Sequence, residues 1–207
     1  MALIDYVCYS SNKNLLGMYY YSQLWKKEVN MKVYIVRHGE TMENASNCLV
    51  GRINSSLTEE GIRQAKQVRD YFKDKNIDLI ISSTLDRCKQ TAEIISDGKI
   101  EVRYTDKLLG RDHGEFTGAP RDSINYDEYW NYYKNIKYER AESVKDLYDR
   151  AVKVLTDLKK DYDDKSIVVV THSGIIRVLY YYFNGIPEDG ALGEVTIKNC
   201  GVYEYDL

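Results

Sequence analysis

Two arginines and two histidines follow segments rich in β-branched residues, a composition that predicts strands. They are Arg37, His38, Arg87 and His172. Neutral imidazole can attack phosphorus without first losing a proton, and guanidinium groups hold phosphoryl oxygens through several donors. Both histidines are followed within two residues by glycine, which lets backbone N–H groups approach an anion. The four residues together indicate an anion site with a nucleophilic histidine.

The elements that must position these residues alternate between strand and helix patterns. We expect strands at residues 33–36, 79–82, 101–104 and 167–170, with a weaker candidate at 202–205. The alternation predicts an α/β fold: a three-layer sandwich with a mostly parallel central sheet flanked by helices. In such sheets, ligands bind beyond the carboxyl ends of the strands. Both arginines and both histidines would then meet at one edge of the sheet.

Two of the helices between these strands have clear start signals. Thr58 can cap a helix that opens with Glu59 and Glu60. Its apolar side is Ile62, Ala65, Val68 and Phe72. Ser143, with Asp146 three residues later, resembles a capping box. The stripe that follows at helical spacing is a predicted core face, formed by Val144, Leu147, Ala151, Val154, Leu155 and Leu158.

Length, composition and charge narrow the class of protein. The chain has 207 residues, enough for one ordinary domain with a substantial core. Its 43% hydrophobic and 29% charged residues are typical of globular proteins. A net charge of −3 argues against a nucleic-acid partner, because such binding needs broad phosphate neutralisation. A local basic pocket for a small anion remains compatible with that charge.

Cysteine spacing and the N-terminal pattern bear on metals and location. The cysteines Cys8, Cys48, Cys88 and Cys200 form no Cys-x-x-Cys pair, so they predict free thiols rather than a metal site. No apolar run approaches the roughly 20 residues that a membrane span needs. The first residues lack the basic start of a secretory signal. We therefore expect a cytoplasmic protein without a membrane partner.

Residues 1–30 differ in pattern from residues 31–207. They mix isolated apolar residues with the cluster Tyr19-Tyr20-Tyr21, whereas Met31 opens a regular strand pattern. One interpretation is an N-terminal extension of uncertain order ahead of a domain over 31–207. The other is a docking segment whose aromatic side chains cover a sheet edge or a dimer partner. Both interpretations stay open, and so does a homodimer.

Several motifs carry a resemblance to a known family. They are Arg37-His38-Gly39-Glu40-Thr41 with Asn44, Leu57-Thr58-x-x-Gly61 with Gln64-Ala65, Ser82-Ser83-x-Leu85-x-Arg87 with Thr91-Ala92, Glu142-Ser143, His172-Ser173-Gly174-x-Ile176-Arg177, and Asn199-Cys200. In this order they resemble the histidine phosphatase superfamily, in its phosphoglycerate-mutase-like branch. The resemblance covers roughly residues 31–207.

The resemblance implies a role for each matching residue. His38 would be the nucleophile that forms a phosphohistidine, while Arg37, Arg87 and His172 grip the phosphoryl oxygens. We expect His172 to act as an imidazolium that adds positive charge as the phosphoryl group transfers. Asn44 can donate a further hydrogen bond, and Ser173 and Gly174 complete the expected substrate-binding set. Water would then hydrolyse the phosphohistidine, so neither a metal nor an organic cofactor is expected.

One position departs from the family pattern. The family's proton donor is usually a glutamate, and the matching residue here is Gly110. Asp112 is the nearest replacement, since residues 110 and 112 of an extended segment face the same way, and we expect it to supply the proton. His113 would point the other way. Arg111 matches a substrate-contacting arginine of mutase-like members and could hold a second anionic group.

The region at about residues 119–141 is predicted to form a small cap over the site. Its aromatic residues are Tyr126, Tyr129, Trp130, Tyr132, Tyr133 and Tyr138. They could form a packed helix under the cap or a wall that stacks on the substrate. Arg177, on the helix after His172, is expected to make a structural ion pair.

The function indicated is a metal-independent phosphatase that acts on a small phosphorylated metabolite. The short cap and the glycine at position 110 favour hydrolysis over phosphoglycerate mutase-type transfer, which is the first alternative. A degenerate phosphate-binding module without catalysis is the second alternative, and Gly110 motivates it. The intact Arg37, His38, Arg87 and His172 count against that module.

Overall fold

The computed structural model describes residues 31–207. The two interpretations of residues 1–30, as an extension or as a docking segment, therefore lie outside the described residues. The strands are β1 (Lys32–Arg37), β2 (Leu79–Ser83), β3 (Val102–Thr105), β4 (Ser166–Thr171) and β5 (Val202–Asp206). The α-helices are α2 (Met42–Ala45), α3 (Glu59–Phe72), α4 (Asp86–Ser96), α5 (Tyr126–Tyr129), α6 (Val144–Asp161) and α7 (Ser173–Asn184). Short 3₁₀ turns are η1 (Asp106–Leu108), η2 (Gly114–Phe116) and η3 (Arg121–Ser123).

The strands form one sheet in the order β3-β2-β4-β1-β5. Strands β1 to β4 pair in parallel, and β5 lies antiparallel to β1 at one edge. The sequence prediction of a mostly parallel sheet is confirmed, including the weak candidate that became β5. Arg37 is paired with Thr171 across β1 and β4. His38 and His172 therefore leave adjacent strands at the same level.

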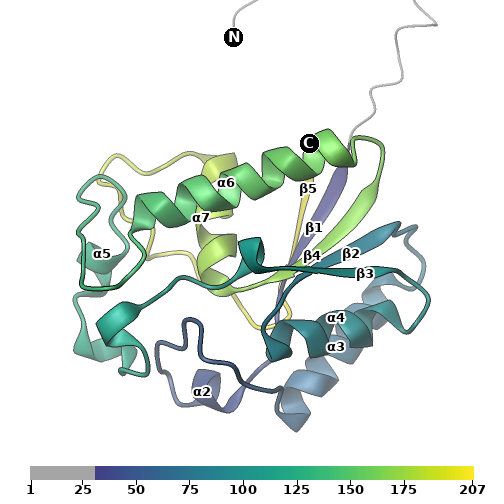
Figure 1. Ribbon diagram of the computed structural model, residues 1–207, viewed down its shortest axis with the longest axis horizontal. Coiled ribbons are helices and arrows are strands. Elements are labelled where there is room, and N and C mark those ends of the chain that lie inside the picture. The colour runs from purple at the N-terminus through teal and green to yellow at the C-terminus, as the bar shows by residue number, and fades with distance from the viewer. Residues whose placement is uncertain (1–30) are drawn as a thin grey trace, which may run out of the picture.

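Helices cover both faces of the sheet, as Figure 1 shows: α6 and α7 lie on one face, and α3 and α4 on the other. Each face has its own core. The α6–α7 side packs against alternate strand residues such as Ile35 and Val169, and the α3–α4 side against Val36 and Val168. This alternation is what parallel strands buried on both faces require. The predicted three-layer sandwich is confirmed.

The two helix-start signals predicted from the sequence are the N-caps of α3 and α6. Thr58 Oγ1 accepts from the N–H of Gly61, and Ser143 Oγ accepts from that of Asp146. All six residues of the predicted α6 stripe are buried. The predicted apolar side of α3 is wrong at Ile62, which is 38% exposed, because the buried row begins one residue earlier at Gly61. Within residues 31–207, no helix combines the length and apolar character needed to cross a membrane.

The segment at 119–141 has little regular structure. It holds η3, the four-residue α5 and connecting loops. Tyr129 and Trp130 are buried in the core on the α6–α7 side, whereas Tyr133 is 56% exposed. Phe116 and Tyr138 pack against Tyr129. Most of these aromatic side chains therefore pack the segment against the core on the α6–α7 side.

Candidate active site

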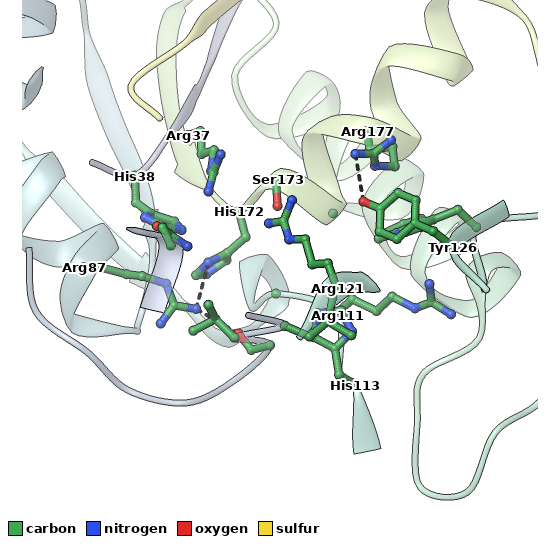
Figure 2. Close-up of a pocket in the computed structure, with 17 residues that line it drawn as sticks. Arg37, His38, Arg87, Arg111, His113, Arg121, Tyr126, His172, Ser173 and Arg177 are labelled. Carbon is green, nitrogen blue, oxygen red and sulfur yellow. Dashed lines mark hydrogen bonds between the residues drawn. The ribbon is translucent and has the colours of Figure 1, made fainter. Parts of the chain in front are cut away.

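A cavity lies beyond the carboxyl ends of β1 and β4, where the register of the sheet places the two histidines. The predicted site residues that line it are Arg37, His38, Asn44, Arg87, Arg111, His172, Ser173 and Gly174. They come from segments far apart in the sequence. In the view of Figure 2, Arg37, His38, Arg87 and His172 stand on one side of the cavity, and Arg111, Arg121, Tyr126 and Arg177 on the other.

His38 is held in the form that a nucleophile needs. Its side chain is buried, and Nδ1 lies 2.7 Å from the carbonyl oxygen of Gly39. A carbonyl only accepts, so Nδ1 carries the proton and Nε2 keeps its lone pair. Burial, and next the positive charges of Arg37 and Arg87, hold the pKa of His38 well below its ordinary value. At neutral pH the ring is uncharged and Nε2 is free to attack.

His172 lies beside it, with the two ring centroids 5.2 Å apart. Arg87 Nη2 donates to His172 Nδ1 across 3.2 Å, and His172 Nε2 lies 2.9 Å from Ser83 Oγ. Since a guanidinium has only donors, Nδ1 must accept and the ring is neutral. Burial, followed by the charge of Arg87, lowers the pKa of His172 well below its ordinary value. His172 is therefore neutral in the ligand-free protein, and its expected role as an imidazolium during phosphoryl transfer stays a prediction.

Carbonyl groups position the two arginines next to the histidines. Arg87 donates to the carbonyl oxygens of Ile53 and Gly51 at 2.5 and 2.8 Å, and Arg37 to that of Ile197 at 2.6 Å. Burial lowers the pKa of both, that of Arg37 to about 10. Both Nε atoms are buried without a hydrogen-bond partner in residues 31–207. Each guanidinium thus stays charged and holds an unused donor.

Amide donors complete the anion-binding surface. The Oδ1 atom of Asn44 accepts from Asn199 Nδ2 and from the N–H of Thr41, which leaves the amide group of Asn44 to donate. Ser173 and Gly174 open α7, and His172 is its N-cap. The first backbone N–H groups of a helix have no partner within the helix, and the helix dipole favours an anion there.

Asp112 is the one predicted site residue that the structure does not bring to the cavity wall. Its Oδ1 accepts from the N–H of Gly114 at 3.0 Å, and its Oδ2 lies 3.3 Å from Arg52 Nη1. The side chains still alternate over this stretch, because Arg111 and His113 line the cavity and Asp112 between them does not. The prediction is wrong about which face of the segment meets the cavity. Asp112 is turned outward and His113 inward, the reverse of the sequence prediction.

Gly110 lies on the cavity wall, where the backbone of another loop comes close. A Cβ atom at this position would lie 2.9 Å from the carbonyl oxygen of Gly51 and 3.4 Å from the ring of His172. Any side chain here must displace the loop that Arg87 holds. Among residues 31–207, no aspartate or glutamate lines this cavity.

Among the lining residues that were not predicted as site residues are His113, Arg121 and Arg177. His113 Nδ1 lies 2.7 Å from the Tyr129 hydroxyl, and burial lowers the pKa of this ring to about 3. Arg177 donates to the carbonyl oxygens of Leu192 and Gly193 at 2.6 Å each. The expected ion pair of Arg177 is therefore wrong. A signal existed, because Arg177 lies on the helix that His172 caps.

The cap aromatics divide between the cavity wall and the core, and the expected stacking on substrate stays a prediction. Tyr126 and Trp130 line the cavity, whereas Tyr129 packs behind it. The cavity thus combines an aromatic wall with the guanidinium groups of Arg37, Arg87, Arg111, Arg121 and Arg177. This excess of positive charge suits a multiply charged anion. Elsewhere in residues 31–207, as in the cavity, no group of three His, Cys, Asp or Glu side chains could hold a metal ion.

Comparisons with known proteins agree with the fold and the site described above. The model of the histidine phosphatase superfamily (branch 1) matches residues 33–207. The chain is 32% identical to the uncharacterized phosphatase PhoE of Bacillus subtilis over 154 residues, which is 74% of this chain and 77% of PhoE. It is also 32% identical to the probable phosphoglycerate mutase GpmB of Yersinia pestis over 183 residues, 85% of each chain.

Two solved structures are similar throughout most of their length. Bacillus stearothermophilus YhfR has a TM-score of 0.76 at 25% identity, covering 84% of this chain and 90% of that one. The phosphoserine phosphatase of Entamoeba histolytica, in complex with 3-phosphoglyceric acid, has a TM-score of 0.75 at 27% identity, covering 84% and 89%. Both comparisons support the α/β architecture described above.

Proposed function

Because the chain belongs to the histidine phosphatase superfamily (branch 1), we propose that it hydrolyses a small organic phosphate monoester through a phosphohistidine on His38. The observation that carries this proposal is the state of His38. Its Nε2 lone pair is free, its ring is neutral, and it stands in a cavity with the guanidinium groups of Arg37 and Arg87. Nucleophile and charge stabilisation are thus assembled before substrate arrives.

The reaction proceeds in two displacements. Nε2 of His38 attacks phosphorus as the bond to the ester oxygen breaks. The leaving group departs as an alkoxide or aryloxide with that electron pair, and water supplies any proton that it takes up. Arg37, Arg87 and Asn44 hold the non-bridging oxygens, together with the backbone N–H groups that open α7. Water then attacks the phosphorus of the phosphohistidine as the P–N bond breaks, and the electron pair returns to Nε2 of His38. The proton that this water loses replaces the one given to the leaving group, and inorganic phosphate departs. Each step balances without a redox partner.

The composition of the cavity wall sets a preference among leaving groups. Poor leaving groups need a proton, and no carboxylate of residues 31–207 lines the cavity. Esters whose leaving oxygen is weakly basic, such as aryl phosphates, should therefore react faster than simple alkyl phosphates. We propose p-nitrophenyl phosphate as the first substrate for this reason.

The test is release of p-nitrophenol with EDTA present. We expect turnover by the full chain, loss of at least about a thousandfold in His38→Ala, and an acid-labile phosphoryl group on the protein after rapid quenching. Lys66→Ala, an exposed position on α3, is the control for a generic effect of substitution. Turnover that survives His38→Ala would rule out the phosphohistidine route.

The reaction products distinguish the proposed phosphatase from two other functions, a mutase and a binding module. The similarity to GpmB favours a mutase as the second candidate, and conversion of 3-phosphoglycerate into 2-phosphoglycerate without phosphate release would support it. A binding module would bind phosphate but release none from any ester. A panel of sugar bisphosphates, α-ribazole phosphate and phosphoglycerates would then rank the phosphatase substrates.

A further inference from the structure

One histidine on the cavity wall has no part in the two displacements described above. All three histidines of the chain line the cavity. His38 is the proposed nucleophile, and both ring nitrogens of His172 already have hydrogen-bond partners. The third is His113, which is 8% exposed and is labelled below Arg111 in Figure 2. His113 is therefore a buried titratable group at the site whose role the phosphohistidine route leaves open.

The hydrogen bond between His113 and Tyr129 fixes where the protons of this pair lie. Nδ1 of His113 is 2.7 Å from the Tyr129 hydroxyl. Burial, and next the charges of Arg111 and Arg121, lower the pKa of this ring to about 3. The Asp112 carboxylate has a smaller effect in the opposite direction. The ring is therefore neutral, and because an imidazole nitrogen accepts more strongly than a phenolic oxygen, the hydroxyl donates to Nδ1 and the ring proton lies on Nε2.

The Nε2 edge of the His113 ring lies beside the phosphoryl clamp. Cδ2, the ring atom bonded to Nε2, would lie 3.0 Å from a Cβ atom on Gly51. The carbonyl oxygen of Gly51 in turn accepts from Arg87 Nη2 at 2.8 Å. Nothing in residues 31–207 accepts a hydrogen bond from Nε2, and this atom retains exposed surface. The Nε2 proton is therefore available to a ligand atom next to the phosphoryl group that Arg87 holds.

Arg111 makes the Tyr129 hydroxyl a usable proton source. Its guanidinium carbon lies 3.9 Å from the centroid of the Tyr129 ring, and its Nη1 donates to the Tyr129 carbonyl oxygen at 2.9 Å. Burial raises the pKa of Tyr129 to about 12, while the charge of Arg111 acts against that rise. A tyrosinate here would face a fixed positive charge that stabilises it. It would be less basic than an alkoxide and more basic than p-nitrophenolate.

We propose that His113 and Tyr129 form a proton relay to the leaving oxygen of the substrate. As the P–O bond breaks, Nε2 of His113 gives its proton to that oxygen, and Nδ1 takes the proton of the Tyr129 hydroxyl. In the second displacement, water gives a proton to Nε2 and Nδ1 returns its own to the tyrosinate, which restores both residues. The relay takes the place of water as the proton source for strongly basic leaving groups. It rests on the phosphatase function, because it needs a phosphoryl group at His38.

The test compares two esters of similar size and equal charge: p-nitrophenyl phosphate, and p-nitrobenzyl phosphate, in which a CH₂ group separates the ring from the ester oxygen. The nitrophenolate is a weak base that leaves without a proton, whereas the benzyl alkoxide needs one. Phosphate release with EDTA present gives kcat/KM for each ester. This quantity reports the step in which the P–O bond breaks. The relay should therefore matter for the benzyl ester and not for the phenyl ester.

Tyr129→Phe is the decisive variant, because it removes the hydroxyl and keeps the buried ring. We expect kcat/KM to fall about a hundredfold for the benzyl ester and to stay within about threefold for the phenyl ester. His113→Gln keeps an N–H donor but cannot pass a proton on, so it should give the same split. Turnover of the phenyl ester shows for each variant that the site is folded, and Tyr129→Phe decides if His113→Gln unfolds.

The matched control is Tyr138→Phe. It deletes a hydroxyl from a ring that packs against Tyr129 and does not line the cavity. Both esters should keep their kcat/KM in this variant. A hundredfold loss for the benzyl ester in Tyr138→Phe would assign the effect to the aromatic cluster and count against the relay.

The remaining outcomes separate the relay from the phosphatase function. An equal loss for the two esters in Tyr129→Phe would mean a structural role, and an unchanged benzyl ester would mean that water supplies the proton. Either result would overturn the relay and leave the phosphatase function intact, as would hydrolysis of the phenyl ester alone by the unmodified protein. If the unmodified protein hydrolyses neither ester, the phosphatase function fails and the relay fails with it.

Discussion

The protonation state of His38 gives the site its expected pH dependence. Only the neutral ring can attack, and burial with Arg37 and Arg87 lowers its pKa well below 6.5. We therefore expect kcat/KM for p-nitrophenyl phosphate, corrected for ionisation of the phosphate, to stay level from pH 8 down through pH 6.5. The acidic fall should come at lower pH, because a lowered pKa keeps the active form present there.

Removing a neighbouring charge should move that acidic fall. Arg37→Gln takes away the larger of the two charge effects on His38. The variant should be slower, and its acidic limb should shift to higher pH because the imidazolium is less disfavoured. Arg140→Gln should leave the limb in place, since its side chain is exposed and outside the cavity. A limb centred at pH 6.5 in the unmodified protein would contradict the derived state of His38.

The position of Asp112 predicts that its carboxylate does not supply the proton. Its carboxylate contacts Gly114 and Arg52 outside the cavity, and its ion pair with Arg52 is partly exposed. Partly exposed pairs of this kind contribute only about 0–1 kcal/mol. Asp112→Asn should therefore keep turnover of an alkyl phosphate within about threefold, measured by phosphate release. A hundredfold loss with unchanged stability would restore Asp112 as the proton donor.

Residues that follow a strand could be predicted from the strand pattern, whereas Arg111 and Asn44 were predicted only through the family resemblance. His38 and His172 follow strands whose pairing puts them together. His113 lines the cavity and Asp112 does not, on a loop that lies between the close approach of Gly51 to Gly110 and the left-handed Gly114. Neither contact leaves a periodic signal. The same holds for Arg177, whose carbonyl partners belong to a loop at residues 192–193.

Between elements, a contact of two glycines fixes the loop that carries His38 against α3. A Cβ atom on Gly39 would lie 2.5 Å from the carbonyl oxygen of Gly61, and a Cβ atom on Gly61 would overlap the backbone of Glu40. Gly39 also donates its N–H to Thr91 Oγ1 on α4. The caps and apolar stripes of these helices were readable because they are local. This long-range contact was not.

Gly61→Ala tests the contact. Alanine in a helix is normally stabilising relative to glycine by up to about 1 kcal/mol. Here the methyl group would push the Arg37-His38-Gly39 loop away from α3, so we expect a loss of about 1–3 kcal/mol in unfolding free energy together with reduced turnover. Urea denaturation measures the first effect and p-nitrophenyl phosphate the second. Lys66→Ala on the same helix should change neither, and a stabilised, fully active Gly61→Ala would disprove the contact.

At the scale of the whole molecule, a chain with net charge −3 concentrates five arginines on one cavity. Burial lowers the pKa of Arg37, Arg87, Arg111 and Arg177 alike. Burial therefore disfavours the charged form of each of these four guanidinium groups. Carbonyl oxygens and aromatic rings stabilise these buried charges. Arg111 Cζ, for example, lies 3.9 Å from the centroid of the Tyr129 ring. Anion binding is therefore coupled to folding stability, because the anion offsets the electrostatic cost of burying these charged guanidinium groups.

Inorganic phosphate should therefore stabilise the protein against unfolding. A ligand that binds only the folded state, at a hundredfold excess over its dissociation constant, adds about 2.7 kcal/mol, and we expect a rise of roughly 5–10 °C in the melting temperature. Sodium chloride at equal ionic strength should raise the melting temperature less, because chloride has no oxygen atoms to accept hydrogen bonds from Arg37 and Arg87. In Arg87→Gln the phosphate-dependent rise should shrink, whereas Arg140→Gln should keep it in full. An equal rise with phosphate and with chloride would mean that salt screening alone, and no specific anion site, stabilises the fold.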